Sequence, residues 1–177
     1  MNTKINTKRK RVKFASDNVT GACPEVLEAV IKANDGIVPP YGNDEISGVL
    51  QEKFSKIFEK DVIVYPTASG TASNALALSA ISPSFGNIYC HKFSHINVDE
   101  CGAPEFYTGG AKLVNLDGIN GKIIAEELNS NISGKGVVHH TQPSSVSITQ
   151  LCETGVAYNL DEIKKISEVA HKHDLNI

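Results

Sequence analysis

The sequence has 177 residues, of which 41% are apolar and 21% are charged, so it can bury the core of one ordinary domain and is not compositionally disordered. Its net charge of −3 gives no reason to expect nucleic acid or an anionic membrane as a partner. No run approaches the ~20 apolar residues that span a membrane, and the four cysteines form no CxxC pair, which favours reduced thiols in a cytoplasmic protein.

Residues 1–13 form a basic N-terminal arm. All of their charged residues are Lys or Arg, and the first acidic residue of the chain is Asp17. They contain no apolar stretch typical of a signal peptide. A nuclear-localisation or nucleic-acid-binding arm is one interpretation. The acidic total charge favours the other, which is a solvated arm or an arm that lies on a neighbouring subunit.

Residues 14–60 are predicted to be an N-terminal helical segment. The stretch from Pro24 to Asn34 has a proline at an early position and one apolar face, which is typical of a helix. A loop with two adjacent prolines follows over 36–43. The stretch 44–60 has an apolar stripe at helical spacing and is predicted to be a second helix.

Residues 61–177 alternate between strand patterns and helix patterns. The predicted elements, in chain order, are a strand at 62–65, a helix over 70–82, strands at 87–90 and 112–116, a short helix at 125–131, a strand at 145–149 and a final helix that begins after Asn159. Asn159 is a good N-cap, and Glu162 completes a capping box with it. The alternation favours an α/β domain with a mostly parallel sheet and flanking helices.

The last three residues, Leu175 to Ile177, look like the opening of a further strand. A strand of three residues buries little, and a natural domain rarely ends by beginning an element. We therefore expect the α/β domain over 61–177 to be cut before its end.

A turn of small residues, Ser69-Gly70-Thr71, lies between the first predicted strand of this region and the helix that follows. A helix N-terminus presents unpaired N–H groups and about half a positive charge, and small residues there let a phosphate approach the backbone. This turn therefore indicates a phosphate site, although the same residues also make an ordinary helix cap. It is neither a P-loop nor a dinucleotide fingerprint, because GxxxxGK[ST] and GxGxxG are both absent.

A second candidate site follows the next predicted strand and should emerge at the same carboxyl edge of the sheet. His91 and His95 are four residues apart, as in some zinc sites, but no third ligand is evident, and we expect no metal. One interpretation is a surface histidine and a buried one, beside a solvated acidic helix face. The other is that His95 faces a bound phosphate compound, as a stacking ring or a base, and that Asp99, Glu100 or Glu105 holds this histidine or a water.

Five blocks of the sequence carry a family resemblance. They are FASDNVTGACPEVLEAV, PPYGND, SGTASNALAL, SHINVDECGAPE and SVSITQLCETGVAYNLDEI. In order and spacing these blocks resemble the low-specificity L-threonine aldolases, which belong to the group of β-eliminating lyases and threonine aldolases. The resemblance covers nearly everything from Phe14 to Ile177. It implies part of the large domain of type I pyridoxal-phosphate-dependent transferases, which is aspartate aminotransferase-like.

The resemblance also implies an activity and a cofactor site. The family cleaves L-threonine and L-allo-threonine to glycine and acetaldehyde with pyridoxal phosphate as cofactor. Ser69, Gly70 and Thr71 match the residues that hold the cofactor phosphate. His95 matches the histidine that stacks on the pyridine ring and helps to deprotonate the substrate hydroxyl. Glu100 matches an acid that acts near this hydroxyl through water.

Two further residues and the assembly are implied in the same way. Ser16 matches a serine that contacts the substrate carboxylate, and Tyr41 matches a tyrosine in a loop near the subunit interface. Family members are dimers or tetramers whose sites are built from two subunits. The resemblance therefore implies a homo-oligomer with a small β-hydroxy amino acid as substrate.

The sequence departs from the family in two places. Thr149, Gln150 and Glu153 occupy the block in which some members carry a further active-site histidine. The family's aspartate for the pyridine nitrogen and its Schiff-base lysine belong to blocks beyond Ile177, so we expect this chain to be inactive alone. The alternatives are another β-eliminating amino-acid lyase of the same fold, or a non-catalytic phosphate-binding fragment.

Overall fold

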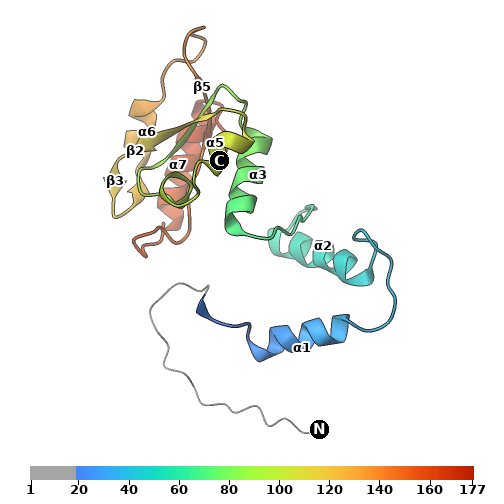
Figure 1. Cartoon of the computed structure of the whole chain (residues 1–177). Helices are drawn as coiled ribbons and strands as arrows, with labels where there is room; N and C mark the ends of the chain where they lie inside the picture. The colour runs from blue at the N-terminus through green and yellow to red at the C-terminus, as the bar shows by residue number, and fades with distance from the viewer. Residues whose placement is uncertain (1–18) are drawn as a thin grey trace. The chain divides into compact units, whose positions relative to one another are not determined.

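The computed structural model describes residues 19–177 (Figure 1). The chain divides into two compact units, Met1–Val64 and Tyr65–Ile177. The basic arm over 1–13 and the candidate residue Ser16 lie outside the described residues.

The first unit holds two helices, α1 (Pro24–Ala33) and α2 (Glu45–Phe58), which confirms both helices predicted there. Pro24 lies in the first turn of α1, where a backbone N–H has no partner within the helix, so proline loses no helical hydrogen bond there. Asp44 caps α2, because its Oδ1 accepts the backbone N–H of Ser47 at 2.9 Å. No residue in the range 19–64 is fully buried, so this part of the chain builds no core of its own.

The strand predicted at 62–65 is wrong, because these residues have no neighbouring strand. Their backbone groups bond to side chains of α2 instead. The N–H of Val64 donates to Oε1 of Gln51 at 2.9 Å, and the amide of Gln51 donates back to the carbonyl of Val64 at 3.1 Å. The backbone groups of Val64 thus find their partners in a helix side chain and not in the sheet.

The second unit is built on a three-stranded sheet. Its strands are β1 (Gly86–His91), β2 (Lys112–Leu116) and β5 (Gln142–Val146), in the order β2-β1-β5, and both neighbouring pairs are parallel. This confirms the predicted parallel sheet. The strand expected at 145–149 begins and ends earlier than predicted. Pro143 pairs with Asn87 beside a shift in register, so the proline does not exclude this segment from the sheet.

A fourth segment starts to pair with the sheet beside β5. The carbonyl of Asn176 accepts the N–H of Val146 at 2.8 Å, and the N–H of Asn176 donates to the carbonyl of Ser144 at 3.0 Å. The single bridge between Ser145 and Asn176 is parallel, as expected for the opening of a strand at 175–177.

One face of the sheet is covered by α6 (Ala125–Asn131) and α7 (Leu160–Lys172), as Figure 1 shows. Side chains alternate along β1, and Tyr89 points toward these two helices. Leu128 of α6 and Ile166 of α7 pack with it in a single buried cluster. This cluster is the larger of the two cores in the unit.

The opposite face is covered by α3 (Gly70–Ile81) and α4 (His95–Val98). Ile88 of β1 points to this side and packs against Leu78 of α3. The short helix α5 (Ala103–Tyr107) lies against α3. Helices therefore cover both faces of a parallel sheet, as this class of fold requires.

A small antiparallel hairpin was not predicted. Its strands are β3 (Gly118–Ile119) and β4 (Lys122–Ile123). The two residues between them, Asn120 and Gly121, have φ angles of +55° and +79°. Two consecutive left-handed residues with the sequence Asn-Gly are typical of a type I′ turn, so the signal was present in the sequence.

The start of α7 confirms the predicted capping box. The side chain of Asn159 accepts the N–H of Glu162 at 2.9 Å, and Oε2 of Glu162 accepts the N–H of Asn159 at 2.8 Å. Oε1 of Glu162 also binds Nζ of Lys122, on β4, at 2.5 Å. The first turn of the helix is therefore tied to the hairpin through one carboxylate.

All four cysteines are free. Cys23 and Cys101 are exposed, whereas Cys90 and Cys152 are buried. Burial raises the pKa of both buried thiols, which keeps them protonated at neutral pH. Within residues 19–177, no helix is long and apolar enough to cross a membrane.

Candidate active site

The start of α3 has free hydrogen-bond donors. Ser69 is its N-cap, and the Oγ of Ser69 accepts the N–H of Ala72 at 3.2 Å. The N–H groups of Gly70 and Thr71 donate to no acceptor in the described part of the chain. The twelve-residue helix adds a partial positive charge at this end. The turn can therefore accept an anion.

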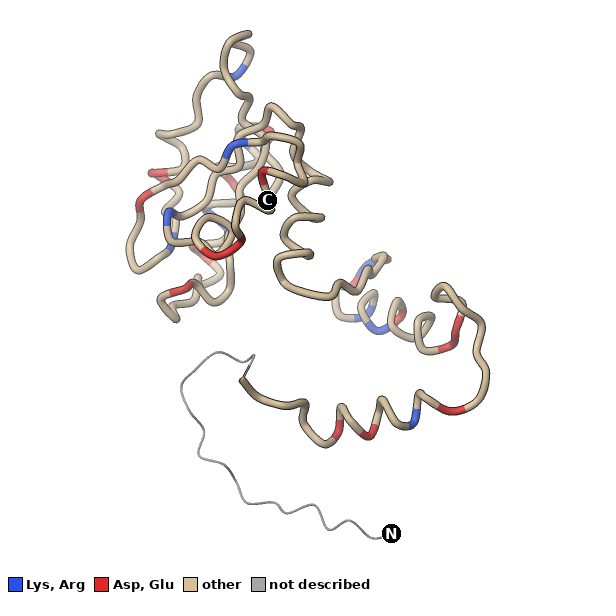
Figure 2. Tube along the Cα trace, in the orientation of Figure 1, with Lys and Arg blue, Asp and Glu red and all other residues tan. Residues whose placement is uncertain are grey.

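The surroundings of this turn are small and uncharged. No Lys, Arg, Asp or Glu lies on α3, which is tan along its length in Figure 2. A Cβ placed on Gly70 would meet no atom within 4 Å, so the space beside the first turn is open. An open depression beside it is lined by Ser69, Thr71, Ala72 and Tyr107, among others. A phosphate here would be held by N–H and hydroxyl groups rather than by a lysine of this helix.

His95 stands at the first position of α4, just beyond the end of β1. Its Nδ1 lies 3.0 Å from Oε1 of Glu100. The side chain of Glu100 is 0% exposed, whereas the side chain of His95 is 42% exposed. The histidine therefore faces solvent, and the carboxylate lies enclosed behind it.

A third residue, Asn74 of α3, joins this pair. Its Nδ2 donates to Oε1 of Glu100 at 2.6 Å. Asn74 lies one helical turn after Thr71, about 4.5 Å farther along the axis, so the donor to Glu100 and the anion-accepting turn share one helix, α3. Sequence reasoning missed Asn74. The available signal was a lone amide beside Ala75 and Leu78, the buried residues of that helix.

The environment of His95 favours its protonated form. The hydrogen bond to Glu100 raises the pKa of His95, and the charges of Glu153 and Asp99 act in the same direction, while burial opposes them more weakly than that bond. Because an ionised carboxylate can only accept, Nδ1 carries a proton, and Nε2 is the nitrogen left to exchange one. The arrangement can therefore present a base, or an acid, at Nε2.

His91 has a different environment from His95. It is buried at the end of β1, and its Nδ1 accepts the N–H of Phe93 at 3.1 Å. Burial lowers the pKa of His91, so this ring is held neutral. Across residues 19–177, no group of three His, Cys, Asp or Glu side chains is placed to hold a metal ion. The two histidines are thus a buried one and a partly exposed one.

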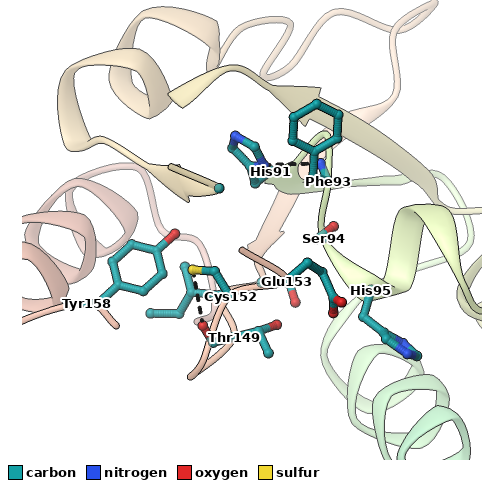
Figure 3. A pocket seen from close by; sticks show the side chains of 11 residues that line it. His91, Phe93, Ser94, His95, Thr149, Cys152, Glu153 and Tyr158 are labelled. Atoms are coloured by element: carbon teal, nitrogen blue, oxygen red, sulfur yellow. Dashed lines mark hydrogen bonds between the residues drawn. The ribbon is translucent and has the colours of Figure 1, made fainter. Parts of the chain in front are cut away.

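Figure 3 shows the pocket at the carboxyl edge of the sheet, where the segments that follow β1 and β5 meet. Phe93 and His95 line it from the β1 side, and Thr149, Cys152 and Glu153 line it from the β5 side. Thr149 and Glu153 stand in the block where the resemblance led us to look for a further histidine. The structure therefore brings that block to the side of His95.

The other two candidate residues belong to parts of the chain that are described separately from this site or not at all. Tyr41 lies in the unit Met1–Val64, in a loop between α1 and α2, with a φ of +64°. This residue is 97% exposed. Ser16 lies outside the described residues.

Ligands of parallel α/β proteins bind beyond the carboxyl ends of the strands, and the partly exposed His95 lies there. By fold and site it belongs to that class of ligand-binding α/β proteins. Comparison of sequences narrows the class further. The chain belongs to the beta-eliminating lyase family, whose profile matches residues 13–177.

Two curated relatives carry the name low specificity L-threonine aldolase. The protein from Pseudomonas sp. (strain NCIMB 10558) is 38% identical over 164 residues, and the protein from Pseudomonas aeruginosa is 36% identical over 164 residues. The matched region is 93% of this chain and 47% of each relative. The chain thus spans about half the length of the curated relatives it matches.

Solved structures show the same fold. A threonine aldolase from Leishmania major superposes with a TM-score of 0.82 at 24% identity, covering 89% of this chain and 46% of that one. YbdL from Escherichia coli, described with a methionine aminotransferase function, superposes with a TM-score of 0.57 at 12% identity, covering 85% of this chain and 38% of that one. At these identities the likeness concerns the fold alone, and it confirms the α/β fold of type I pyridoxal-phosphate enzymes.

The cofactor of this family is pyridoxal phosphate, and residues of this chain fit two of its parts. The free N–H groups of Gly70 and Thr71, with the hydroxyl of Thr71, suit a phosphate. The partly exposed imidazole of His95 offers a flat surface for an aromatic ring.

Proposed function

We propose that this chain is the N-terminal portion of a pyridoxal-phosphate-dependent carbon–carbon lyase that cleaves L-threonine and L-allo-threonine to glycine and acetaldehyde. The contact between His95 and Glu100 carries the proposal, because removal of a hydroxyl proton needs a base that is both oriented and accessible. The names of the two Pseudomonas relatives support a small β-hydroxy amino acid as the substrate.

In this proposal the start of α3 binds the cofactor phosphate. The N–H groups of Gly70 and Thr71 and the hydroxyls of Ser69 and Thr71 are the donors. When bound, the cofactor supplies an acceptor for the electrons of the Cα–Cβ bond that breaks. The domain organisation that we propose is a basic arm over 1–13, a helical segment over 14–60 and part of the cofactor-binding domain over 61–177.

His95 is the proposed catalytic residue. Its ring would face the cofactor ring, and Nε2 would take the proton of the substrate β-hydroxyl as the Cα–Cβ bond breaks and the aldehyde leaves. A proton would then be delivered to Cα to give glycine. Throughout, Nδ1 keeps its proton and donates it to Oε1 of Glu100 in a hydrogen bond. Because the Glu100 side chain is enclosed, we assign it a role through His95, in preference to direct action near the hydroxyl through water.

The remaining residues are proposed to act in an assembly. We infer that Ser16 contacts the substrate carboxylate and that Tyr41 lies near a subunit interface. The exposure of Tyr41 within its own unit supports a role in contact with a partner subunit. The assembly is a homo-oligomer, a dimer or tetramer with sites shared by two subunits. We place it in the cytoplasm, in keeping with its free cysteines.

The test replaces His95 in the complete gene product and measures glycine and acetaldehyde formed from L-threonine. His95→Asn should lower this rate by ~10²–10⁴-fold, the usual contribution of a general base, and leave the circular dichroism spectrum unchanged. His139→Asn and His171→Asn are the controls, because both residues are exposed. Equal losses in all three variants would overturn the role of His95.

The same assay separates the alternative functions. Cleavage of tyrosine or cysteine with no aldehyde from threonine would indicate a different β-eliminating lyase. A complete gene product that binds pyridoxal phosphate without converting any amino acid would indicate a non-catalytic module.

A further inference from the structure

The carboxylate of Glu100 is oriented by two hydrogen bonds to one oxygen. Oε1 lies 2.6 Å from Nδ2 of Asn74 and 3.0 Å from Nδ1 of His95. The other oxygen, Oε2, is buried and has no hydrogen-bond partner within the described residues. The orientation of this enclosed carboxylate therefore depends on the two donors at Oε1.

These two donors are not equivalent. His95 is the group whose orientation matters for the reaction, and its side chain is 42% exposed. Asn74 comes from the second turn of α3, a twelve-residue helix anchored in the core by Ala75 and Leu78. The amide of Asn74 is thus the donor that a rigid element holds in place.

We propose that Asn74 is a positioning residue of this active site: its amide holds Glu100 so that His95 keeps a proton on Nδ1 and presents Nε2 to the substrate. The inference rests on the proposed function, because it adds a residue to that same site. It also links the phosphate turn to the histidine, since Thr71 and Asn74 lie one turn apart on α3.

Loss of the Asn74 amide should weaken the preference of His95 for a proton on Nδ1. A carboxylate that has lost its fixed donor can rotate, and this rotation weakens its bond to Nδ1. Glu153 and Asp99 also act on His95, but neither bonds to Asn74. The substitution therefore removes the contribution of Glu100 and leaves the other two charges in place.

The test is nitrogen NMR of histidine side chains in the complete gene product, prepared without cofactor or substrate. In the wild type we expect His95, identified with His95→Asn, to show the Nδ1–H tautomer at high pH. In Asn74→Ala we expect loss of this preference and a titration midpoint at lower pH. Ser79→Ala is the matched control on α3, because the hydroxyl of Ser79 bonds only to the carbonyl of Leu76.

Two further variants separate positioning from a merely structural role. If Asn74 acts through Glu100, Asn74→Ala should add nothing to the change already caused by Glu100→Gln. Asn74→Leu repeats the measurement with a side chain that also branches at Cγ and has no donor. The proposal is overturned if both Asn74 variants keep the wild-type tautomer and midpoint, if the effects of Asn74→Ala and Glu100→Gln add, or if both Asn74 variants unfold.

This measurement does not depend on catalysis. A wild-type gene product with no activity toward threonine would overturn the proposed function and leave the tautomer of His95 unaffected. Conversely, an active enzyme in which Asn74→Ala leaves His95 unchanged would overturn the positioning role alone.

Discussion

The phenolic oxygen of Tyr158 accepts the backbone N–H of Ile123 at 2.7 Å, although 35 residues separate the two in the sequence. Both residues belong to the core cluster under α6 and α7. Burial raises the pKa of Tyr158 to about 12, so the hydroxyl remains neutral at every pH at which the fold would be studied. The Tyr158 hydroxyl therefore helps to attach the β3–β4 hairpin to the core, together with the buried side chain of Ile123.

Removal of this hydroxyl should cost stability. Tyr158→Phe leaves the buried N–H of Ile123 without an acceptor, which should lower the free energy of unfolding by about 1–3 kcal/mol. Urea denaturation followed by circular dichroism measures the loss. Tyr107→Phe is the control, because Tyr107 is exposed. Equal urea midpoints for the two variants would contradict the prediction.

The phosphate site predicts a ligand-specific effect of Thr71. Thr71→Val keeps the shape of the side chain and removes one donor without touching the Ser69 cap. We expect pyridoxal phosphate to bind about 5- to 150-fold more weakly, corresponding to the ~1–3 kcal/mol of one desolvated hydrogen bond to a charged group. Titration calorimetry measures this ratio. Pyridoxal, which lacks the phosphate, should bind both forms equally, and the same loss for both ligands would argue against a phosphate contact.

His95 and His91 should respond to pH in opposite directions. The bond to Glu100 raises the pKa of His95, so its contribution to stability is full below the pKa of an unfolded histidine, about 6.5, and is lost as pH rises through the folded value. Burial lowers the pKa of His91, so its contribution is present above that pKa and declines as pH falls toward the lower folded value.

A difference measurement isolates the His95 contribution, because the contribution of His91 cancels. We expect the free energy of unfolding of the wild type to exceed that of Glu100→Gln by most at about pH 5.5, with the excess shrinking toward about pH 8.5. Urea unfolding across this range measures it. An excess that grows with pH would show that the contact with Glu100 does not favour protonated His95.

The N-cap of α7 should contribute measurably to the free energy of unfolding. Asn159→Ala removes the acceptor for the N–H of Glu162, and replacements of this kind cost ~0.5–2 kcal/mol. Thermal unfolding of Asn159→Ala against Asn131→Ala, an exposed asparagine at the end of α6, measures the difference. Indistinguishable melting temperatures would contradict the prediction.

Elements with local signals were predictable from the sequence. Asn159 and Glu162 begin α7 through bonds that span three residues, so the cap is readable without knowing the fold. The strand expected at 62–65 failed for the opposite reason. A strand depends on hydrogen bonds to a neighbouring strand, whereas the backbone N–H of Val64 donates to the side chain of Gln51.

The residues of the site also separate into those with a local sequence signal and those whose contacts depend on the fold. Ser69, Gly70 and Thr71 could be singled out because a helix start made of small residues is a contiguous pattern. His95 could be singled out because it follows a strand. Asn74 could not, because its role comes from an approach between α3 and a residue 26 positions later. The roles of all these residues, like those of Ser16 and Tyr41, stay predictions.

Glu162 joins the first turn of α7 to the β3–β4 hairpin. One of its oxygens accepts the first backbone N–H of the α7 cap, and the other binds Lys122 of the hairpin. Neither bond survives if this side chain swings out into solvent. Amides in the first turn of α7 and in β3–β4 should therefore exchange with deuterium together, through one shared local opening rather than through separate fraying of each.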